Sequence, residues 1–240
     1  MRALLLIALT PFCFSAYGQT EKHVSIPIHK NQKNELDTSL WYKWKYELAR
    51  QIDLTDLQTS AHTFHFRFWI DVQAIDLWTT DHCSYFGLIT NYAQRYDDKL
   101  LRKGIYKIGK VYSNQITLDT AKAKKLFNMI RHLSIVDLPS DHDIEGWGSG
   151  FDGEEYLIEV STTSEYQFKT YWTPRIFTDS LKEARQIQEF IDFLNDVLKI
   201  KEYYKLKLPK GTYRRDGIQG VHIRMHSEWV PGATKVTDLL

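Results

Sequence analysis

Residues 63–74 read TFHFRFWIDVQA, and their pattern decides the fold because an apolar side chain stands at every second position. The apolar positions are Phe64, Phe66, Phe68, Ile70, Val72 and Ala74. This alternation is typical of a β-strand with one buried face. The alternation changes phase at Ile75 and Leu77, which indicates a bulge. Residues 79–82 then predict a turn, and residues 85–92 predict the returning strand of a hairpin.

Helices are predicted around this hairpin where apolar residues recur at spacings of three and four. Residues 38–52 have this spacing and predict the first helix. A second helix is expected behind Asp119, which has the side chain of a helix N-cap. A third is expected behind Ser180, which forms the capping-box pattern S-x-x-E with Glu183. Residues 95–103 are charged and predict a loop.

A second hairpin is predicted from strand patterns at 156–160 and 166–170. Consecutive strands with helices set apart predict the α+β class. We expect a mainly antiparallel sheet, built from a strand meander plus a hairpin and packed by two or three helices. Four segments are expected: a cleaved signal peptide (1–18), an N-terminal lead-in with an aromatic helix (19–60), an α+β domain (61–204) and a C-terminal extension with a possible short strand (205–240).

The first 18 residues have the features of an export signal. Arg2 supplies a positive charge, residues 3–14 are mostly apolar, and Ala16 and Gly18 are small residues at the expected cleavage positions. The apolar run is shorter than the roughly 20 residues that a membrane-spanning helix needs. We therefore expect cleavage after Gly18 and a periplasmic or extracellular location, with no transmembrane segment in the mature chain.

The charge balance argues against a nucleic-acid partner. The chain has 31 Lys and Arg against 30 Asp and Glu, and loss of the leader would remove only Arg2 from this balance. A neutral chain has no overall basic excess for a polyanion. Loss of the leader would also remove Cys13 and leave Cys83 alone, so no intrachain disulfide is expected.

The block at 146–174, GWGSGFDGEEYLIEVSTTSEYQFKTYWTP, resembles a family of uncharacterised secreted bacterial proteins. The shared pattern is DG-x-x-Y-x-x-E followed by Y-W-T-P, and the resemblance covers roughly residues 104–200. It implies an exported α+β domain. It assigns no activity and no catalytic residue.

The rim of this second hairpin is the predicted binding surface. Its members are Trp147, Asp152, Glu159, Tyr171 and Trp172. Trp147 stands in a polar loop, where an indole is expected to be exposed. Glu159 lies between two apolar residues and so points to the opposite face of its strand, either towards solvent or into a site. Asp152 and Glu159 together are the candidate acids of a hydrolase, since paired carboxylates perform acid–base chemistry.

The loop before this hairpin has the spacing of a calcium ligand set. Asp141, Asp143 and Glu145 occupy alternate positions, Gly146 is sixth and Asp152 is twelfth. An EF-hand loop places oxygen ligands at these positions. Glu at the fifth position and Asp at the twelfth depart from the EF-hand pattern, and a strand is expected where a helix should follow. The alternative is an acidic solvated loop.

No short motif of a known catalytic class occurs in the chain. The sequence therefore favours a non-enzymatic exported domain without a cofactor, which binds an unknown small molecule or an envelope protein. The first alternative is a hydrolase that uses Asp152 and Glu159. The second is a structural module stabilised by calcium.

Overall fold

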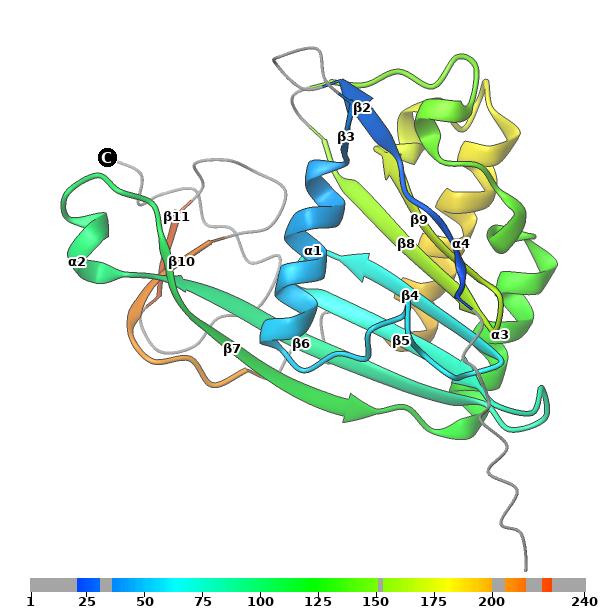
Figure 1. Cartoon of the computed structure of the whole chain (residues 1–240), viewed down its shortest axis with the longest axis horizontal. Helices are drawn as coiled ribbons and strands as arrows, with labels where there is room; N and C mark the ends of the chain where they lie inside the picture. Colours follow the sequence, from blue (N-terminus) through cyan, green and yellow to red (C-terminus); the bar gives the residue numbers. More distant parts are fainter. Residues whose placement is uncertain (1–20, 31–35, 151–152, 200–205, 215–221, 226–240) are drawn as a thin grey trace, which may run out of the picture.

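A curved sheet of nine strands forms the centre of the molecule (Figure 1). The computed structural model describes residues 21–30, 36–150, 153–199, 206–214 and 222–225. The strands of the sheet are β1 (His23–Ser25), β4 (Phe64–Ile70), β5 (Gln73–Thr79), β6 (Phe86–Tyr96), β7 (Ile108–Thr117), β8 (Glu155–Thr162), β9 (Glu165–Trp172), β10 (Gly211–Arg214) and β11 (His222–Met225). Their order is β1-β9-β8-β4-β5-β6-β10-β11, and β7 pairs with β6.

The sheet is mixed. Strand β1 runs parallel to β9, whereas the other pairings of this sheet in the described residues are antiparallel. A separate two-stranded sheet is formed by β2 (Ile28–Lys30) and β3 (Leu36–Thr38). The α+β class predicted from the sequence is confirmed, with a parallel edge strand that the sequence analysis did not predict.

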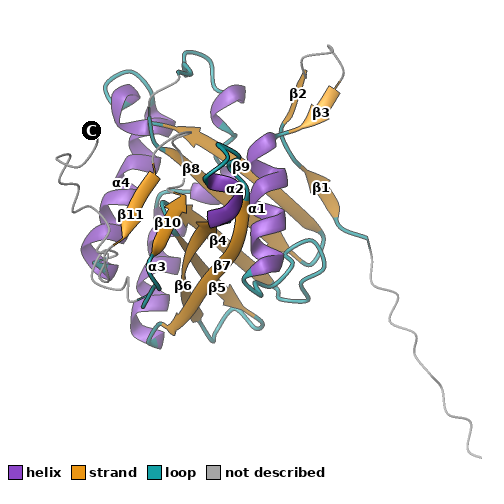
Figure 2. Cartoon of the chain, turned by 90° about the vertical axis from the view of Figure 1, so that its left-hand side faces the viewer, coloured by secondary structure: helices purple, strands orange, loops and turns teal. Residues whose placement is uncertain are grey.

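Helices cover both faces of the sheet. They are α1 (Leu40–Gln51), α2 (Asp98–Leu101), α3 (Thr120–His132) and α4 (Lys182–Leu198), and three short 3-10 helices are η1 (Ile135–Asp137), η2 (Asp141–Asp143) and η3 (Pro174–Phe177). Helix α1 lies on one side of the sheet, and α3 and α4 lie on the other (Figure 2). Both faces of the central strands are therefore buried.

The face under α3 and α4 is apolar. Phe66 and Phe68 of β4 are fully buried there, and both rings make edge contacts with Phe190 of α4, at centroid distances of 5.7 and 5.5 Å. Leu126 and Phe127 of α3 belong to the same buried cluster. The alternating residues at 64–68 thus form the inner layer of this core, as their period predicted.

The predicted strand over 64–74 is in fact a tight hairpin. Strand β4 ends at Ile70, which pairs with Gln73, so Asp71 and Val72 form a two-residue turn. Asp71 has a φ of 47°, a left-handed conformation that Asp tolerates better than most residues. The phase change at Ile75 therefore comes from reversal of the chain and not from a bulge.

Residues 95–117 also differ from the prediction. Strand β6 continues to Tyr96, and the charged segment behind it contains the single-turn helix α2 instead of being wholly loop. Strand β7 is continuous through Asn114, whose side chain accepts a hydrogen bond from Asn91 of β6 at 2.8 Å. Cross-strand pairing of the two amides keeps Asn114, a residue common in turns, within the strand.

The first helix, predicted from residue 38, begins at Leu40, and the helix predicted behind Asp119 begins at Thr120. Asp119 caps α3 by accepting a hydrogen bond from the backbone N–H of Lys122 at 2.8 Å. The capping box at Ser180 is wrong, because the N-cap of α4 is Leu181 and the Ser180 hydroxyl donates to the carbonyl of Phe177.

None of the described helices is long and apolar enough to cross a membrane.

The turn at Asp71 provides a test of the hairpin. We expect Asp71→Val to lower the free energy of unfolding by about 1–2 kcal/mol, because a β-branched residue is disfavoured at a positive φ. Asp71→Gly is the control, since it also removes the carboxylate but adopts this φ without strain. Chemical denaturation of both variants measures the difference. Equal stability of the two variants would contradict the assigned turn.

Candidate functional site

The aromatic residues of the predicted rim pack against one another. The indole N–H of Trp147 donates to the carbonyl of Trp172 at 2.9 Å, and the Trp147 ring lies 5.8 Å from the Tyr171 ring. Phe177 contacts both indoles, at centroid distances of 5.5 and 6.1 Å. Tyr171 is fully buried, and Trp147 is partly buried against the core under α3 and α4. These rings therefore form a packed unit more than an open platform.

The glycine-rich loop approaches this unit closely. A Cβ added at Gly150 would come within 2.7 Å of the Trp172 ring. A Cβ added at Gly153 would meet the side chains of Trp172 and Thr173. Glycine is needed here because the backbone passes directly over the indole. Asp152, which lies between these glycines, is outside the described residues.

Glu159 is buried, in contrast to the solvent-facing interpretation. It does point away from the apolar face, but α1 and the segment behind it cover the face to which it points. One carboxylate oxygen accepts from the indole N–H of Trp69 at 2.7 Å and from Arg67 Nη1 at 3.4 Å. The other oxygen accepts from the Tyr166 hydroxyl at 2.7 Å. Glu159 is 8% exposed, so its carboxylate is committed to the interior.

Glu159 belongs to a buried charge network that spans three adjacent strands. Arg67 of β4 lies opposite both Asp76 of β5 and Glu159 of β8. Its Nε donates to Asp76 Oδ1 at 2.7 Å, and its Nη2 donates to the carbonyl of Thr55 at 2.9 Å. His65 contacts the same Asp76 oxygen through Nε2 at 2.9 Å. We call Arg67, Asp76, Glu159 and His65 the charge network.

The charges of the network stabilise one another electrostatically. Burial acts to raise the pKa of Asp76, but the Arg67 guanidinium and the His65 hydrogen bond outweigh it and hold this pKa below its usual value. Burial and then the Glu159 charge raise the pKa of Tyr166. The network was not predicted from the sequence, because Glu159 joins it from a strand that is distant in sequence. The available signal was the polar series at His65 and Arg67 in a strand that is central to the sheet.

The calcium-like residues are partly used in internal contacts. Asp141 Oδ1 accepts from the Thr170 hydroxyl at 2.6 Å, and Asp141 Oδ2 accepts from the backbone N–H of Trp172 at 2.8 Å. Asp143 is exposed and lies 3.4 Å from His142 Nε2. Glu145 is also exposed. Within the described part of the chain, no group of three or more His, Cys, Asp or Glu is placed to hold a metal ion. The calcium hypothesis stays a prediction, because Asp152 is outside that part.

Glu155 is an acidic residue of this region that the sequence analysis did not select. It opens β8, where it pairs with Trp172. Burial, and then the charge of the neighbouring Asp141, raise the pKa of Glu155 to about 8. The Glu155 carboxyl group is therefore harder to ionise than that of an exposed glutamate. Nothing in the sequence separated it from the adjacent Glu154, because the proximity to Asp141 is a tertiary feature.

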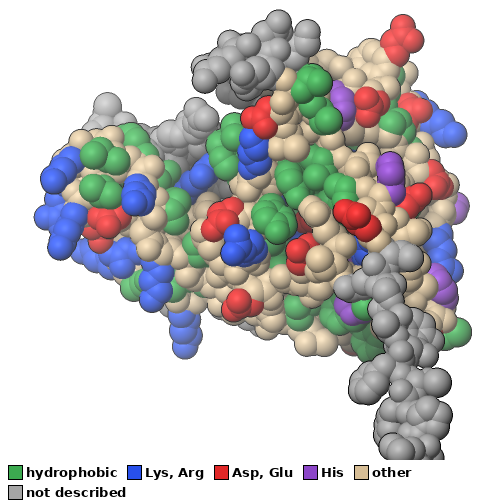
Figure 3. Space-filling model, in the orientation of Figure 1, with side chains coloured by type: hydrophobic (Ala, Val, Ile, Leu, Met, Phe, Trp, Pro, Cys, Tyr) green, Lys and Arg blue, Asp and Glu red, His purple; other side chains and the backbone are tan. Residues whose placement is uncertain are grey.

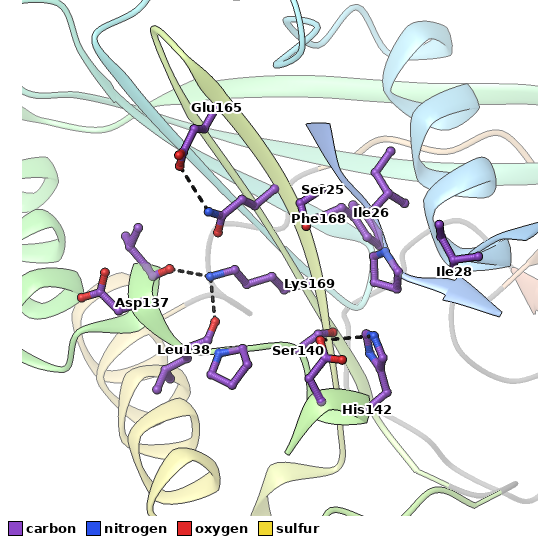
Figure 4. Close-up of a pocket in the computed structure, with 15 residues that line it drawn as sticks. Ser25, Ile26, Ile28, Asp137, Leu138, Ser140, His142, Glu165, Phe168 and Lys169 are labelled. Carbon is purple, nitrogen blue, oxygen red and sulfur yellow. Dashed lines mark hydrogen bonds and ion pairs between the residues drawn. The ribbon is translucent and has the colours of Figure 1, made fainter. Parts of the chain in front are cut away.

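A cleft of about 750 Å³ lies at the outer edge of β9 (Figure 4). One wall is the N-terminal segment with Ile26 and Ile28, and the other is the segment that contains Asp137 and Leu138. Phe168 and Lys169 of β9 lie between the two walls. None of these residues was selected from the sequence.

The cleft exists because two different segments cover the edge of β9. Strand β1 pairs with β9 only as far as Gln167, and Pro27 then follows without an N–H for further pairing. Beyond this point Ser140 and Asp141 accept hydrogen bonds from the backbone N–H groups of Thr170 and Trp172. The cleft lies between β1 and the segment that contains Ser140 and Asp141.

Lys169 is fixed in the wall of the cleft. Its ammonium group donates to the backbone carbonyls of Val136 and Leu138, and the second of these bonds is 2.7 Å long. Burial lowers the pKa of Lys169 to about 8, opposed by the charge of Asp137. The lysine thus holds the 136–138 segment against β9.

The mouth of the cleft is acidic. Asp137, Asp143 and Glu165 are exposed among its lining residues, and His142 lies beside Asp143. The ammonium of Lys169 is already bound by two carbonyls. The lining is therefore mainly polar, with a rim on which carboxylates outnumber cations, and this favours a positively charged ligand.

No protein-family model matches the chain, and no curated protein matches its sequence. The resemblance of residues 104–200 to secreted bacterial proteins stays a prediction.

The charge network provides a stability prediction. We expect Glu159→Met to lower the free energy of unfolding by about 3–5 kcal/mol, because it leaves buried donors of Arg67, Trp69 and Tyr166 without their acceptor. Glu165→Met on β9 is the matched control, since this glutamate is exposed, and its effect should stay within about 0.5 kcal/mol. Urea titrations of both variants measure the difference. A small effect of Glu159→Met would mean that the network contributes little.

The raised pKa of Glu155 predicts a pH dependence of stability. Between the ordinary value of 4.5 and about 8, the folded chain keeps a proton that the unfolded chain releases. Stability from this group is therefore lost as pH rises through that interval. Glu155→Gln should remove this loss. The free energy of unfolding of the variant, relative to that of the wild type, should therefore be on the order of 1–3 kcal/mol higher at about pH 8 than at about pH 5.

Thermal unfolding across this pH range measures the effect, with Glu145→Gln as the control at an exposed acid of the preceding loop. Parallel pH profiles of the wild type and Glu155→Gln would show that Glu155 ionises normally.

Proposed function

We propose that this chain is an exported binding domain of the cell envelope, and that it binds a positively charged ligand in the cleft at the edge of β9. The ligand is an organic amine or a basic side chain of a partner protein. The observation that supports this function is the excess of exposed carboxylates over cations in the lining of one cleft.

The size and lining of the cleft support this proposal. A volume of about 750 Å³ is in the range of small-molecule sites. Ile28, which is 58% exposed, offers apolar surface to the body of a ligand, while Asp137, Asp143 and Glu165 attract its cationic group. The proposal places this site outside the cytoplasm, because residues 1–18 have the features of an export signal.

The position of Glu159 favours binding over hydrolysis. A catalytic carboxylate has to come within hydrogen-bond reach of its substrate. Both oxygens of Glu159 are occupied by Trp69, Arg67 and Tyr166 inside the protein. The cleft acids, in contrast, are exposed at the surface.

The test is calorimetric titration with two probes, a short amidated peptide that contains arginine and leucine and its counterpart with glutamine for arginine. We expect the arginine peptide alone to bind, and added salt to weaken its binding. Asp137→Asn with Glu165→Gln should weaken binding by about tenfold or more, because two attractive charges are removed.

Asp179→Asn with Glu189→Gln is the matched control, since it makes the same charge change at exposed positions outside the cleft. Its affinity should equal that of the wild type. Equal loss in both double variants would show a non-specific charge effect, and no preference for the arginine peptide would overturn the proposal.

A further inference from the structure

A basic tip projects from the end of the sheet where β6 passes into β7. It consists of residues 97–110 and includes α2, which lies at the far end of the molecule from α3 and α4 (Figure 1). Residues 102–107, with the sequence RKGIYK, are all exposed. Ile105 is 50% exposed and Tyr106 is 62% exposed. An apolar pair therefore stands at the surface between cations.

The backbone of the tip is held in a defined shape. Asp97 caps α2 by accepting from the N–H groups of Lys99 and Leu100 at 2.9 and 3.0 Å. At the other end Gly104 has a φ of 75°, its N–H donates to the carbonyl of Leu101, and the N–H of Ile105 donates to the carbonyl of Leu100. This pair of bonds is a Schellman motif. The motif turns the chain so that Ile105 and Tyr106 are presented outwards.

Tyr106 is supported from below. Its ring packs edge-on against Tyr96 of β6 at a centroid distance of 5.9 Å. An aromatic ring with one supported side and a polar hydroxyl suits an interface between apolar and aqueous phases. Tyr106 is therefore held in place before any partner arrives, which lowers the entropic cost of binding.

The charge of the tip is strongly positive, although the whole chain carries only +1. Its cations are Lys99, Arg102, Lys103, Lys107 and Lys110. With its two acids Asp97 and Asp98 the tip has a net charge of +3; Asp97 caps α2, and Asp98 forms an ion pair with Arg95. Figure 3 shows Lys and Arg side chains gathered at this end, with apolar atoms among them. The balanced composition thus conceals a polarised surface.

The neighbouring strand extends the basic surface. Tyr213 of β10 pairs with Arg95 of β6, close to the base of the tip. Lys207 and Lys210 are exposed in the segment that leads into β10. Segments far apart in the sequence therefore contribute cations to the same end of the molecule.

We propose that the tip docks the protein on an anionic phospholipid surface. Ile105 and Tyr106 enter the headgroup layer, and the surrounding cations contact lipid phosphates. Charge complementarity supplies the attraction, and each cation near such a surface strengthens binding about fivefold. The exposed apolar pair favours a membrane over a nucleic acid, because Ile105 has no role in contacts with a phosphate backbone.

The test is sedimentation with vesicles, using the chain as purified from the periplasm of a bacterial expression host. One set of vesicles contains phosphatidylglycerol and phosphatidylcholine in equal parts, and the other contains phosphatidylcholine alone. We expect binding to the anionic vesicles and its weakening by sodium chloride. Equal binding to both sets, or binding to neither, would overturn the proposal.

Two double variants measure separately what the cations and the apolar pair contribute to vesicle binding. Lys103→Gln with Lys107→Gln should weaken binding to anionic vesicles roughly 20-fold. Lys124→Gln with Lys125→Gln, at exposed positions of α3, is the matched control and should change binding less than about twofold. Equal weakening by both pairs would assign the attraction to overall charge and overturn the docking site.

Ile105→Ser with Tyr106→Ser should weaken vesicle binding about tenfold or more while its salt dependence remains. A duplex DNA oligonucleotide is the competing probe. If the serine variant bound vesicles like the wild type, or if DNA bound as tightly as the anionic vesicles, the tip would be a general polyanion site and the membrane proposal would be wrong. Circular dichroism and thermal unfolding of each variant confirm that the fold is retained.

Discussion

Arg67 pairs with carboxylates on both neighbouring strands, and the arrangement of the sheet centre depends on this interaction. Arg67 is 1% exposed, and its guanidinium contacts Asp76 of β5 and Glu159 of β8. A buried charge is tolerated only when it is paired. A shift of one residue in either pairing would move a carboxylate to the opposite face of its strand. Burial of Arg67 therefore constrains the register of three strands at once.

This constraint also decides where function can lie. The charge network and the apolar core occupy the two faces of the central strands, and helices cover both (Figure 2). Surfaces for partners are therefore found at the margins of the sheet. At one margin Pro27 stops the pairing of β1 and leaves the cleft beside Phe168. At another the chain between β6 and β7 forms a basic tip.

The sequence predicted local features well and long-range ones poorly. The helix behind Asp119 and the strands on either side of 163–164 follow from cap chemistry and alternation, which act over a few residues. The phase change at Ile75 predicted a bulge in place of the turn at Asp71, because a phase change in alternation fits either interpretation. Glu159 was assigned to the correct face of its strand. Its burial could not be foreseen, since it depends on the helix that packs there.

By itself the sequence determined the α+β class, the main helices, the second hairpin and the apolar face of β4, because hydrophobic period is a property of neighbouring residues. Only the tertiary structure decided the partners of Arg67, the cleft at β9 and the concentration of charge at the tip. Each of these depends on residues from distant segments meeting in space. Composition records how many charges a chain carries, but only the fold sets which of them are paired in the interior and which gather at one end.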